Sequence, residues 1–384
     1  MGAWAVKYMG SKRRMLENGL GQLLCEQAGC ATRVVDLFCG AGSVSWYAAE
    51  NTELPVLAID LQVYAAAMAL AVIGRDKPLD GGKLSKRWIS KAKRRRSSSR
   101  LFKRAREMEG RARDVPSLVG DARDLCGETC SRMRPIWSAY GGYYFSPSQA
   151  ITFDYMLRYL PADECERWVC LAATISAASM CAASPGHTAQ PFRPTESAGR
   201  FILEAWSRDP LQYCQRALDD IGPRHAQVRG AAVVGDAVTV VESLGPDDLV
   251  VIDPPYSGVQ YSRFYHVLET MARGQCGGVS GAGRYPPFAE RPQSDFSRKT
   301  TSRAALRKLF EALSAAGSTV IVTFPSGECS NGLSGEMVTG MARAWFTVEK
   351  RVVSGQFSTL GGNNAHRAPR KPSSELMLLL RPRT

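Results

Sequence analysis

The sequence lacks long apolar runs. No stretch approaches the ~18 consecutive apolar residues of a membrane-spanning helix, and the basic N-terminal residues are not followed by the apolar segment of a secretory signal. We therefore expect a cytoplasmic protein without a membrane partner. Fully disordered and fibrous chains are excluded as well, because 45% of the 384 residues are hydrophobic and 22% are charged.

Histidine is scarce, and the cysteines form no convincing metal-binding pattern. The four histidines show no ligand spacing, and we expect His266 at the surface. The eleven cysteines are scattered; Cys126 with Cys130, and Cys165 with Cys170, have spacings that are weak signals for a metal. An odd number of cysteines without an export signal predicts reduced thiols, and we expect no bound metal.

Acidic residues are nearly absent from residues 83–113. This segment has fourteen lysines and arginines and only two glutamates, a net charge of +12 in a chain whose formal net charge is +13. Such a block is typical of proteins that bind nucleic acid, because phosphate contacts release counterions; a solvated surface helix is the alternative. Trp88 and Phe102 interleave with the charges and could stack on bases or anchor the segment to the core. The residues that we expect to contact phosphates are Arg94, Arg95, Arg96, Arg100, Lys103 and Arg104.

The order of apolar segments predicts an α/β fold. Residues 32–38 and 55–60 have the pattern of short buried strands, each followed by a helical segment, which is typical of a doubly wound, mostly parallel, Rossmann-like sheet. The alternation stops near residue 75 and resumes near residue 230. We therefore expect a split domain of residues 1–75 and 230–384, with residues 76–229 as a large insertion.

Glycines follow the first predicted strand. The sequence DLFCGAG (residues 36–42) precedes a predicted helix, whose N-terminal N–H groups can approach a ligand closely. It is not the G-x-G-x-x-G of dinucleotide enzymes, because Ser45 and Trp46 stand where the third glycine would fall. Asp60 ends the next strand, where an acid accepts hydrogen bonds from a ribose or caps the following helix. Together these signals favour a nucleotide-type ligand.

Asp253, Pro254, Pro255 and Tyr256 directly follow an apolar strand at residues 249–252. The two prolines fix φ and remove two N–H donors, which leaves rigid carbonyls between an acid and an aromatic ring. A carboxylate and a carbonyl can accept the two N–H bonds of an exocyclic amine while the ring stacks on its base. Because ligands gather at the carboxyl ends of parallel strands, we expect the three motifs to line one cleft; a strand-ending turn is the alternative.

Together these motifs resemble a known family. The tetrapeptide DPPY (residues 253–256), with DLFxGxG and the opening KYMGSK (residues 7–12), is similar to the Dam-type (alpha-group) DNA adenine-N6 methyltransferases with a DPPY motif. QYSRFYH (residues 260–266) also looks like the helix after the tetrapeptide in one branch of these enzymes. The sequence departs from the family at Tyr8, where an indole is common, and in the basic segment.

The resemblance implies a function and a set of site residues. The chain would transfer a methyl group from S-adenosylmethionine to the N6 amine of an adenine flipped out of double-stranded DNA, and the insertion would recognise the target. Lys12 would meet the cofactor's carboxylate, Asp60 its ribose and Asp236 its adenine. The catalytic residues would be Asp253, Pro254, Pro255 and Tyr256, and the cofactor-binding residues Tyr8, Lys12, Asp36, Phe38, Gly40, Gly42, Asp60, Asp236 and Asp253. Association with the nucleoid through DNA, and a cognate restriction or defence-system partner, are further expectations.

Other nucleic-acid enzymes share parts of this pattern. N4-cytosine methyltransferases use the same chemistry, and RNA base amino-methyltransferases carry similar motifs. C5-cytosine methylation is disfavoured, because it needs a cysteine nucleophile, typically after proline, and none of the 21 prolines is followed by cysteine. A non-enzymatic, basic nucleic-acid-binding protein is the remote alternative.

Overall fold

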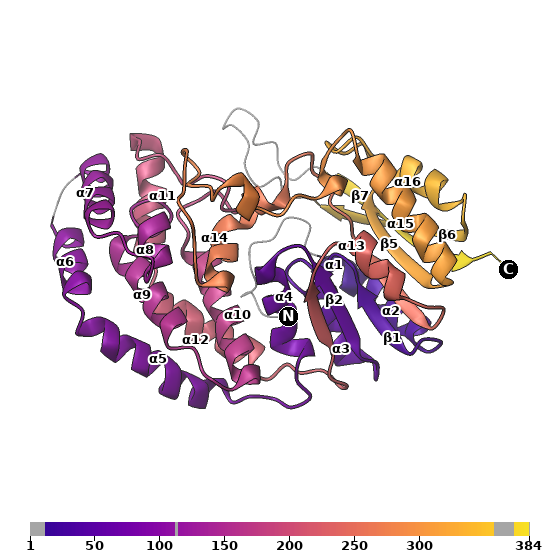
Figure 1. Cartoon of the computed structure of the whole chain (residues 1–384), viewed down its shortest axis with the longest axis horizontal. Helices are drawn as coiled ribbons and strands as arrows, with labels where there is room; N and C mark the ends of the chain where they lie inside the picture. The colour runs from indigo at the N-terminus through magenta and orange to yellow at the C-terminus, as the bar shows by residue number, and fades with distance from the viewer. Residues whose placement is uncertain (1–11, 112–113, 357–371, 384) are drawn as a thin grey trace. The chain divides into compact units, whose positions relative to one another are not determined.

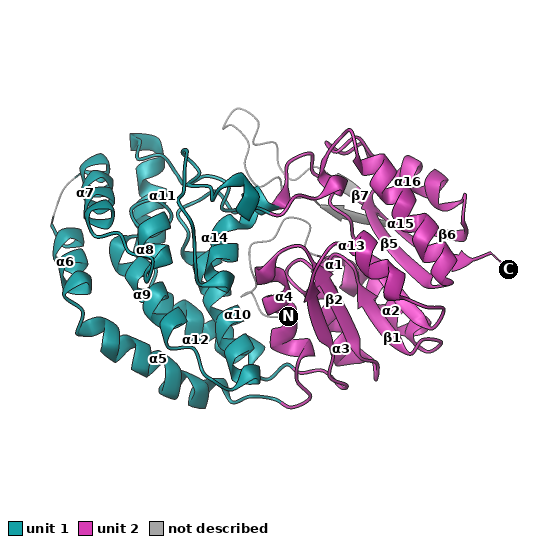
Figure 2. Cartoon of the chain, in the orientation of Figure 1, with its two compact units in different colours: residues 1–9, 78–224, 262–291 teal, residues 10–77, 225–261, 292–384 magenta. Residues whose placement is uncertain are grey.

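A computed structural model describes residues 12–111, 114–356 and 372–383 of the chain (Figure 1). These residues cluster into two units (Figure 2). Unit 1 contains residues 78–224 and 262–291, and unit 2 contains the described residues of 10–77, 225–261 and 292–384. No described helix is long and apolar enough to cross a membrane.

Unit 2 contains a seven-stranded sheet in the order β3-β2-β1-β4-β5-β7-β6. Neighbours from β3 to β5 pair in parallel, whereas β7 runs antiparallel between β5 and β6. The strands are β1 (Arg33–Asp36), β2 (Val56–Asp60), β3 (Ala231–Val234), β4 (Asp248–Ile252), β5 (Thr319–Pro325), β6 (Phe346–Gln356) and β7 (Pro372–Pro382). The predicted α/β, mostly parallel sheet is therefore confirmed, and the order from β3 to β5 is compatible with a Rossmann-like fold.

Apolar residues bury the sheet on both faces. Val35 of β1 pairs with Val250 of β4, and both belong to one core with the apolar residues of α13, α15 and α16. Val34 and Val251 point to the opposite face and are also fully buried. A strand that is covered on both faces has a continuous apolar sequence, as in β4, and not an alternating one.

Short helices connect the strands of unit 2 (Figure 1). Helices α3 and α4 pack against β1, β2 and β3. The helical elements of this unit are α1 (Arg13–Met15), η1 (Leu16–Leu20), α2 (Gly21–Ala28), α3 (Ser43–Asn51), α4 (Val63–Ile73), α13 (Ala237–Val240), η2 (Val241–Ser243), η4 (Asp295–Ser297), α15 (Ser302–Ala316) and α16 (Gly335–Ala342).

The described residues of unit 1 form mainly helices. Polar caps begin several of them: Asp80 accepts the Lys83 N–H at the start of α5, and Ser146 and Gln149 form a capping box at the start of α9. The elements are α5 (Gly81–Ser97), α6 (Arg100–Glu109), α7 (Val115–Glu128), α8 (Pro135–Tyr140), α9 (Pro147–Arg158), α10 (Glu164–Cys181), α11 (Glu196–Trp206), α12 (Pro210–Ile221), α14 (Tyr261–Arg273) and η3 (Phe288–Glu290). Helix α10 is buried over most of its surface and is the central helix of this bundle.

Residues 262–291 cluster with unit 1, although the sequence pattern assigns them to the split domain. The physical reason is aromatic packing: the ring of His266 on α14 lies 5.7 Å from that of Tyr140 and 5.8 Å from that of Tyr144. The expectation that His266 lies at the surface is wrong, because its side chain is buried. Burial lowers the pKa of His266 to about 4, so the imidazole is neutral.

Candidate active site

Four acidic residues gather at one edge of the sheet in unit 2. Asp36 ends β1, Asp60 ends β2 and Asp253 directly follows β4, and these three strands are parallel. Strand β7 runs the other way, so its beginning lies at this edge and Glu375 pairs with Pro325, the last residue of β5. The structure therefore brings together three of the four predicted carboxylates, Asp36, Asp60 and Asp253, and adds Glu375.

Lys12 supplies a positive charge among these acids. Its Nζ atom lies 3.1 Å from Asp253 Oδ1 and 3.1 Å from Glu375 Oε2, and its side chain is only 4% exposed. Burial alone would lower the pKa of Lys12, but the charges of Asp253 and Glu375 outweigh it, and the pKa is raised. An ammonium has three N–H donors, so these two ion pairs, which are its partners among the described residues, leave a third donor that can face a ligand.

The carboxylate of Asp253 is held through one of its oxygen atoms. Oδ1 faces Lys12 and also accepts a hydrogen bond of 2.8 Å from the hydroxyl of Thr323, a buried residue of β5. Within the described chain no donor contacts Oδ2, and the side chain is 18% exposed. Burial raises the pKa of Asp253, and Lys12 opposes this effect. The arrangement fixes the carboxylate and leaves Oδ2 as an acceptor.

Asn331 holds Pro255, the second of the two prolines that follow Asp253. Its buried side-chain amide donates to the carbonyl oxygen of Pro255 (2.8 Å) and to that of Phe296 (3.1 Å). The Pro254 carbonyl accepts no hydrogen bond within the described part of the chain. Tyr256 is half-buried, and the centroid of its ring lies 5.8 Å from Nζ of Lys12. Asp253, the Pro254 carbonyl and the Tyr256 ring are thus consecutive in the segment that follows β4.

The glycine turn and Asp60 are joined by backbone hydrogen bonds. Oδ2 of Asp60 accepts the Gly40 N–H and Oδ1 accepts the Gln62 N–H, each at 3.0 Å. Gly42 has φ +80°, and a Cβ atom there would lie 2.9 Å from Nε1 of Trp46. This position therefore requires glycine.

Asp36 and Cys39 are buried beneath this turn. The Ser45 hydroxyl donates to Oδ2 of Asp36 at 2.6 Å. Burial raises the pKa of Asp36 to about 7, because the hydrogen bond from Ser45 compensates only in part. Burial also raises the pKa of the Cys39 thiol, with contributions from Asp60 and Asp36, so the thiolate is disfavoured. Cys39 is therefore unsuited to act as a nucleophile.

Among the described residues, the other predicted cofactor-binding residues form no hydrogen bond or ion pair with Lys12 or Asp253. Phe38 is half-buried and packs edge-on against Phe296, with ring centroids 5.0 Å apart. Asp236 follows β3, is exposed, and caps α13 by accepting the Val238 N–H at 2.8 Å. Tyr8 lies outside the described residues.

Most of the predicted phosphate-contacting residues are exposed on unit 1. They are Arg94 and Arg95 of α5 and Arg100, Lys103 and Arg104 of α6. Arg96 differs, because it is half-buried, donates to Thr152 Oγ1 at 3.0 Å and lies 4.3 Å from the centroid of the Phe102 ring. Trp88 is 2% exposed and donates to the Met156 carbonyl, so it anchors α5 to the bundle and is not available for stacking on a base.

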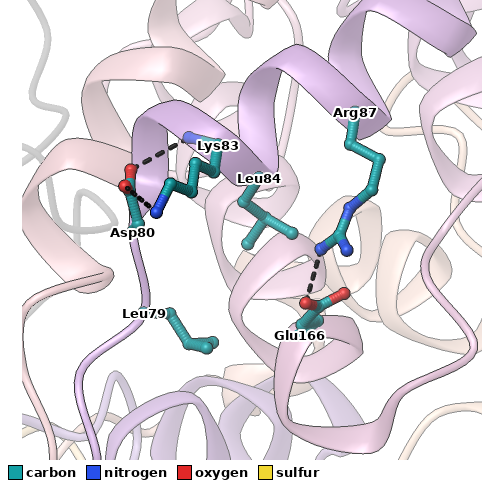
Figure 3. A pocket seen from close by; sticks show the side chains of 6 residues that line it. All are labelled: Leu79, Asp80, Lys83, Leu84, Arg87 and Glu166. Carbon is teal, nitrogen blue, oxygen red and sulfur yellow. Dashed lines mark hydrogen bonds and ion pairs between the residues drawn. The ribbon is translucent and has the colours of Figure 1, made fainter.

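An open pocket of about 280 Å³ lies at the beginning of α5 in unit 1 (Figure 3). Its charged side chains pair with one another: Arg87 with Glu166, and Lys83 with Asp80. These pairs leave no uncompensated group for a ligand, and we assign the pocket no role.

Sequence reasoning missed Glu375, Thr323 and Asn331. Glu375 lies near the beginning of β7, and only the antiparallel direction of that strand brings it to Lys12. Thr323 lies in the mostly apolar strand β5, and its sequence context does not distinguish it from a buried core residue. Asn331 follows no recognisable motif, and no signal in the sequence points to it.

No protein-family model matches the chain, and no curated protein matches it. Among the described residues, no group of three His, Cys, Asp or Glu side chains is arranged to hold a metal ion.

Proposed function

We propose that the chain is an S-adenosylmethionine-dependent methyltransferase that modifies the N6 amine of adenine in DNA. The observation that carries this proposal is the fixed carboxylate of Asp253. Lys12 and Thr323 hold its Oδ1, and Oδ2 and the Pro254 carbonyl are left as acceptors. An exocyclic amine has two N–H donors, and these two oxygen atoms can accept both.

The charge of the site fits the cofactor. Within the described part of the chain, Asp253 and Glu375 pair with Lys12, and Asp36 and Asp60 add two further carboxylic acids at the same edge of the sheet. Such an excess of acid repels the phosphates of dinucleotides but suits a ligand with sulfonium and ammonium charges. Lys12, Phe38, Gly40, Gly42 and Asp60 are the residues that would hold S-adenosylmethionine, which when bound supplies an electrophilic methyl group.

The residues of the chain would prepare the amine in three ways. The amino nitrogen of adenine is a poor nucleophile, because its lone pair is delocalised into the ring. Hydrogen bonds to Asp253 Oδ2 and the Pro254 carbonyl favour a more tetrahedral nitrogen and stabilise the positive charge that develops there. The Tyr256 ring stacks on the base, which orients it and offsets part of the cost of unstacking, and the raised pKa of Asp253 makes its carboxylate a better proton acceptor.

DNA is the substrate that the charge of unit 1 supports. Arg94, Arg95, Arg100, Lys103 and Arg104 are exposed on neighbouring helices, in a segment with a net charge of +12. Phosphate contacts of this kind position a duplex without reading its sequence. The N4 amine of cytosine would meet the same acceptors, so product analysis must decide between the two bases.

The test has a binding and a product measurement. Purified protein should bind S-adenosylmethionine in calorimetry, and DNA from a methylation-free host that expresses the protein should carry N6-methyladenine at a defined sequence. Asp253→Ala should abolish transfer; because it also removes one carboxylate partner of the buried Lys12, the variant should melt at a lower temperature but still fold. Tyr256→Phe should retain much of the activity and Tyr256→Ala should lose most of it, since stacking needs only the ring. Unmodified DNA, or near-normal turnover of Asp253→Ala, would contradict the proposal.

A further inference from the structure

Arg284 of unit 1 has an unusual backbone conformation. Among the described residues it is the one non-glycine residue with positive φ, at +54°. Its guanidinium donates to the carbonyl oxygens of Ala139 (2.9 Å) and Ser138 (3.2 Å). The turn that contains Arg284 is closed by two backbone hydrogen bonds of 2.9 Å between Ser280 and Tyr285. A left-handed conformation persists only where surrounding contacts over-determine it, and it often marks a functional position.

The Arg284 side chain belongs to a series of stacked cations and rings. Its guanidinium carbon lies 4.5 Å from the centroid of the Tyr143 ring, and that of Arg123 lies 4.3 Å from the same centroid. Both guanidinium groups therefore contact the same ring. Tyr285 follows Arg284 in the sequence, and its ring centroid lies 4.9 Å from the guanidinium carbon of Arg263 and 5.5 Å from that of Arg291. We call Arg123, Tyr143, Arg284, Tyr285, Arg291 and Phe288 the arginine–aromatic ladder.

Part of the positive charge of the ladder is not compensated. Arg123 and Arg284 form no ion pair within the described part of the chain. Burial lowers the pKa of Arg123, and the nearby charge of Arg284 lowers it further. Asp124 is next to Arg123 in the sequence, and Glu290, next to Arg291, accepts the backbone N–H of Gly277. Two neighbouring guanidinium groups without an ion pair suit a polyanion; Nε and Nη2 of Arg284 already donate to backbone carbonyls, so within the described residues its Nη1 group is the one left for a phosphate.

The ladder ends at an exposed ring. Phe288 is 63% exposed, and Arg291 lies 5.6 Å from its centroid. Pro286 and Pro287 precede it and fix the backbone, so little conformational freedom remains to be lost when the ring binds. An exposed aromatic ring among arginines is the combination that single-stranded nucleic acid prefers, because every base has a face on which a ring can stack.

We propose that the arginine–aromatic ladder binds unpaired DNA, with Phe288 stacked on a nucleobase and the arginines on neighbouring phosphates. The proposal rests on the proposed function for its ligand, DNA, but not on the methyl-transfer chemistry. It assigns to unit 1 a second nucleic-acid surface, which contacts bases, in addition to the phosphate-contacting residues of α5 and α6.

The test measures the affinity of the full chain for a fluorescein-labelled single-stranded oligonucleotide of mixed sequence, by anisotropy, over a range of salt concentrations. Phe288→Ala should weaken binding about 5- to 150-fold and leave the salt slope unchanged, because stacking carries no charge. Phe288→Trp should bind as tightly as the wild type. Arg284→Gln should flatten the salt slope by ~0.7, the value for one phosphate contact on a single strand.

Met133→Ala is the matched control, because Met133 is a large apolar residue of unit 1 that is 67% exposed and lies outside the ladder. Wild-type affinity of Phe288→Ala, or an equal loss in Met133→Ala, would overturn the proposal. A lower melting temperature of Arg284→Gln with an unchanged slope would show that the ladder only fastens its loop. Tighter binding of the matching RNA would overturn DNA as the ligand.

The outcomes separate this proposal from the proposed function. DNA binding that depends on Phe288, without any methyl transfer, would support the ladder and contradict the enzyme. Methyl transfer by the chain, together with wild-type DNA affinity of Phe288→Ala, would support the enzyme and contradict the ladder. A wild-type chain that binds no DNA would overturn both.

Discussion

Lys12 Nζ lies 3.1 Å from Glu375 Oε2, although 363 positions separate the two residues in the sequence. Through Lys12, Glu375 also acts on Asp253, which shares the same ammonium. A buried cation between two carboxylates is costly to leave incomplete, because removal of one partner exposes the remaining charges to a poorly solvated environment. The charge of Glu375, a residue outside the predicted motifs, therefore affects the charged groups of the candidate active site.

Glu375→Gln should shift the pH dependence of methyl transfer. The charge of Glu375 contributes to the raised pKa of Asp253, so its removal should lower that pKa. If the ionised form of Asp253 is the active one, the acid limb of the kcat profile should move to lower pH. Glu349→Gln on β6 is the control, because Glu349 pairs with Arg351 at the surface. An unmoved acid limb would contradict the electrostatic role of Glu375.

Thr323→Val should shift the same profile in the opposite direction. The Thr323 hydroxyl donates to Asp253 Oδ1 and lowers the pKa of that carboxyl. Valine has a similar shape but no donor, so the acid limb should move to higher pH. Activity should fall about 10-fold or more, as expected for a lost hydrogen bond to a charged group of ~1.5–3 kcal/mol. Thr323→Ser restores the donor and should restore both quantities; a serine variant that behaves like valine would point to lost packing instead.

Replacement of Arg94, Arg95, Arg100 and Lys103 by glutamine should weaken binding to all DNA duplexes similarly. Each lost phosphate contact should reduce the slope of log affinity against log salt concentration by up to ~0.9. The DNA sequence that is methylated should stay the same. Arg96→Gln should instead lower the melting temperature, because Arg96 is hydrogen-bonded to Thr152. A changed methylation sequence with an unchanged salt dependence would show that this segment contacts bases.

Asp36→Asn should remove part of the pH dependence of stability. The pKa of Asp36 is about 7 in the folded protein, against ~3.9 in an unfolded chain. Between these values the folded state binds the extra proton, so the contribution of Asp36 to stability falls as the pH rises through this range and is constant above it. From about pH 5 to about pH 8, the free energy of unfolding should shift by about 3 kcal/mol in favour of the asparagine variant. The measurement is urea denaturation of both proteins over this pH range. If the free energies of unfolding of the wild type and the variant change in parallel with pH, Asp36 is already ionised in the folded state.

The sequence predicts the part of the site that depends on strand ends. Asp36, Asp60 and Asp253 each follow a short apolar segment, and the carboxyl ends of parallel strands meet at one edge. The direction of β7 could not be predicted, because an apolar run has the same pattern in parallel and antiparallel strands, and Glu375 was missed with it. The clustering of residues 262–291 with unit 1 was not anticipated for a different reason: the packing of His266 on Tyr140 joins segments more than a hundred residues apart. Arg96 faces inward because helical periodicity, and not charge, decides which arginines of α5 reach solvent.

The position of β7 has a consequence for synthesis of the protein. Strand β7 follows β6 in the chain but lies between β5 and β6 in the sheet, so β6 cannot join the sheet until the ribosome has made β7. Glu375 comes with that strand, and Lys12 has only one of its two carboxylate partners before then. A nascent chain that has already made β1 to β6 therefore has an incomplete site, and the proposed activity would begin only when this late strand is inserted.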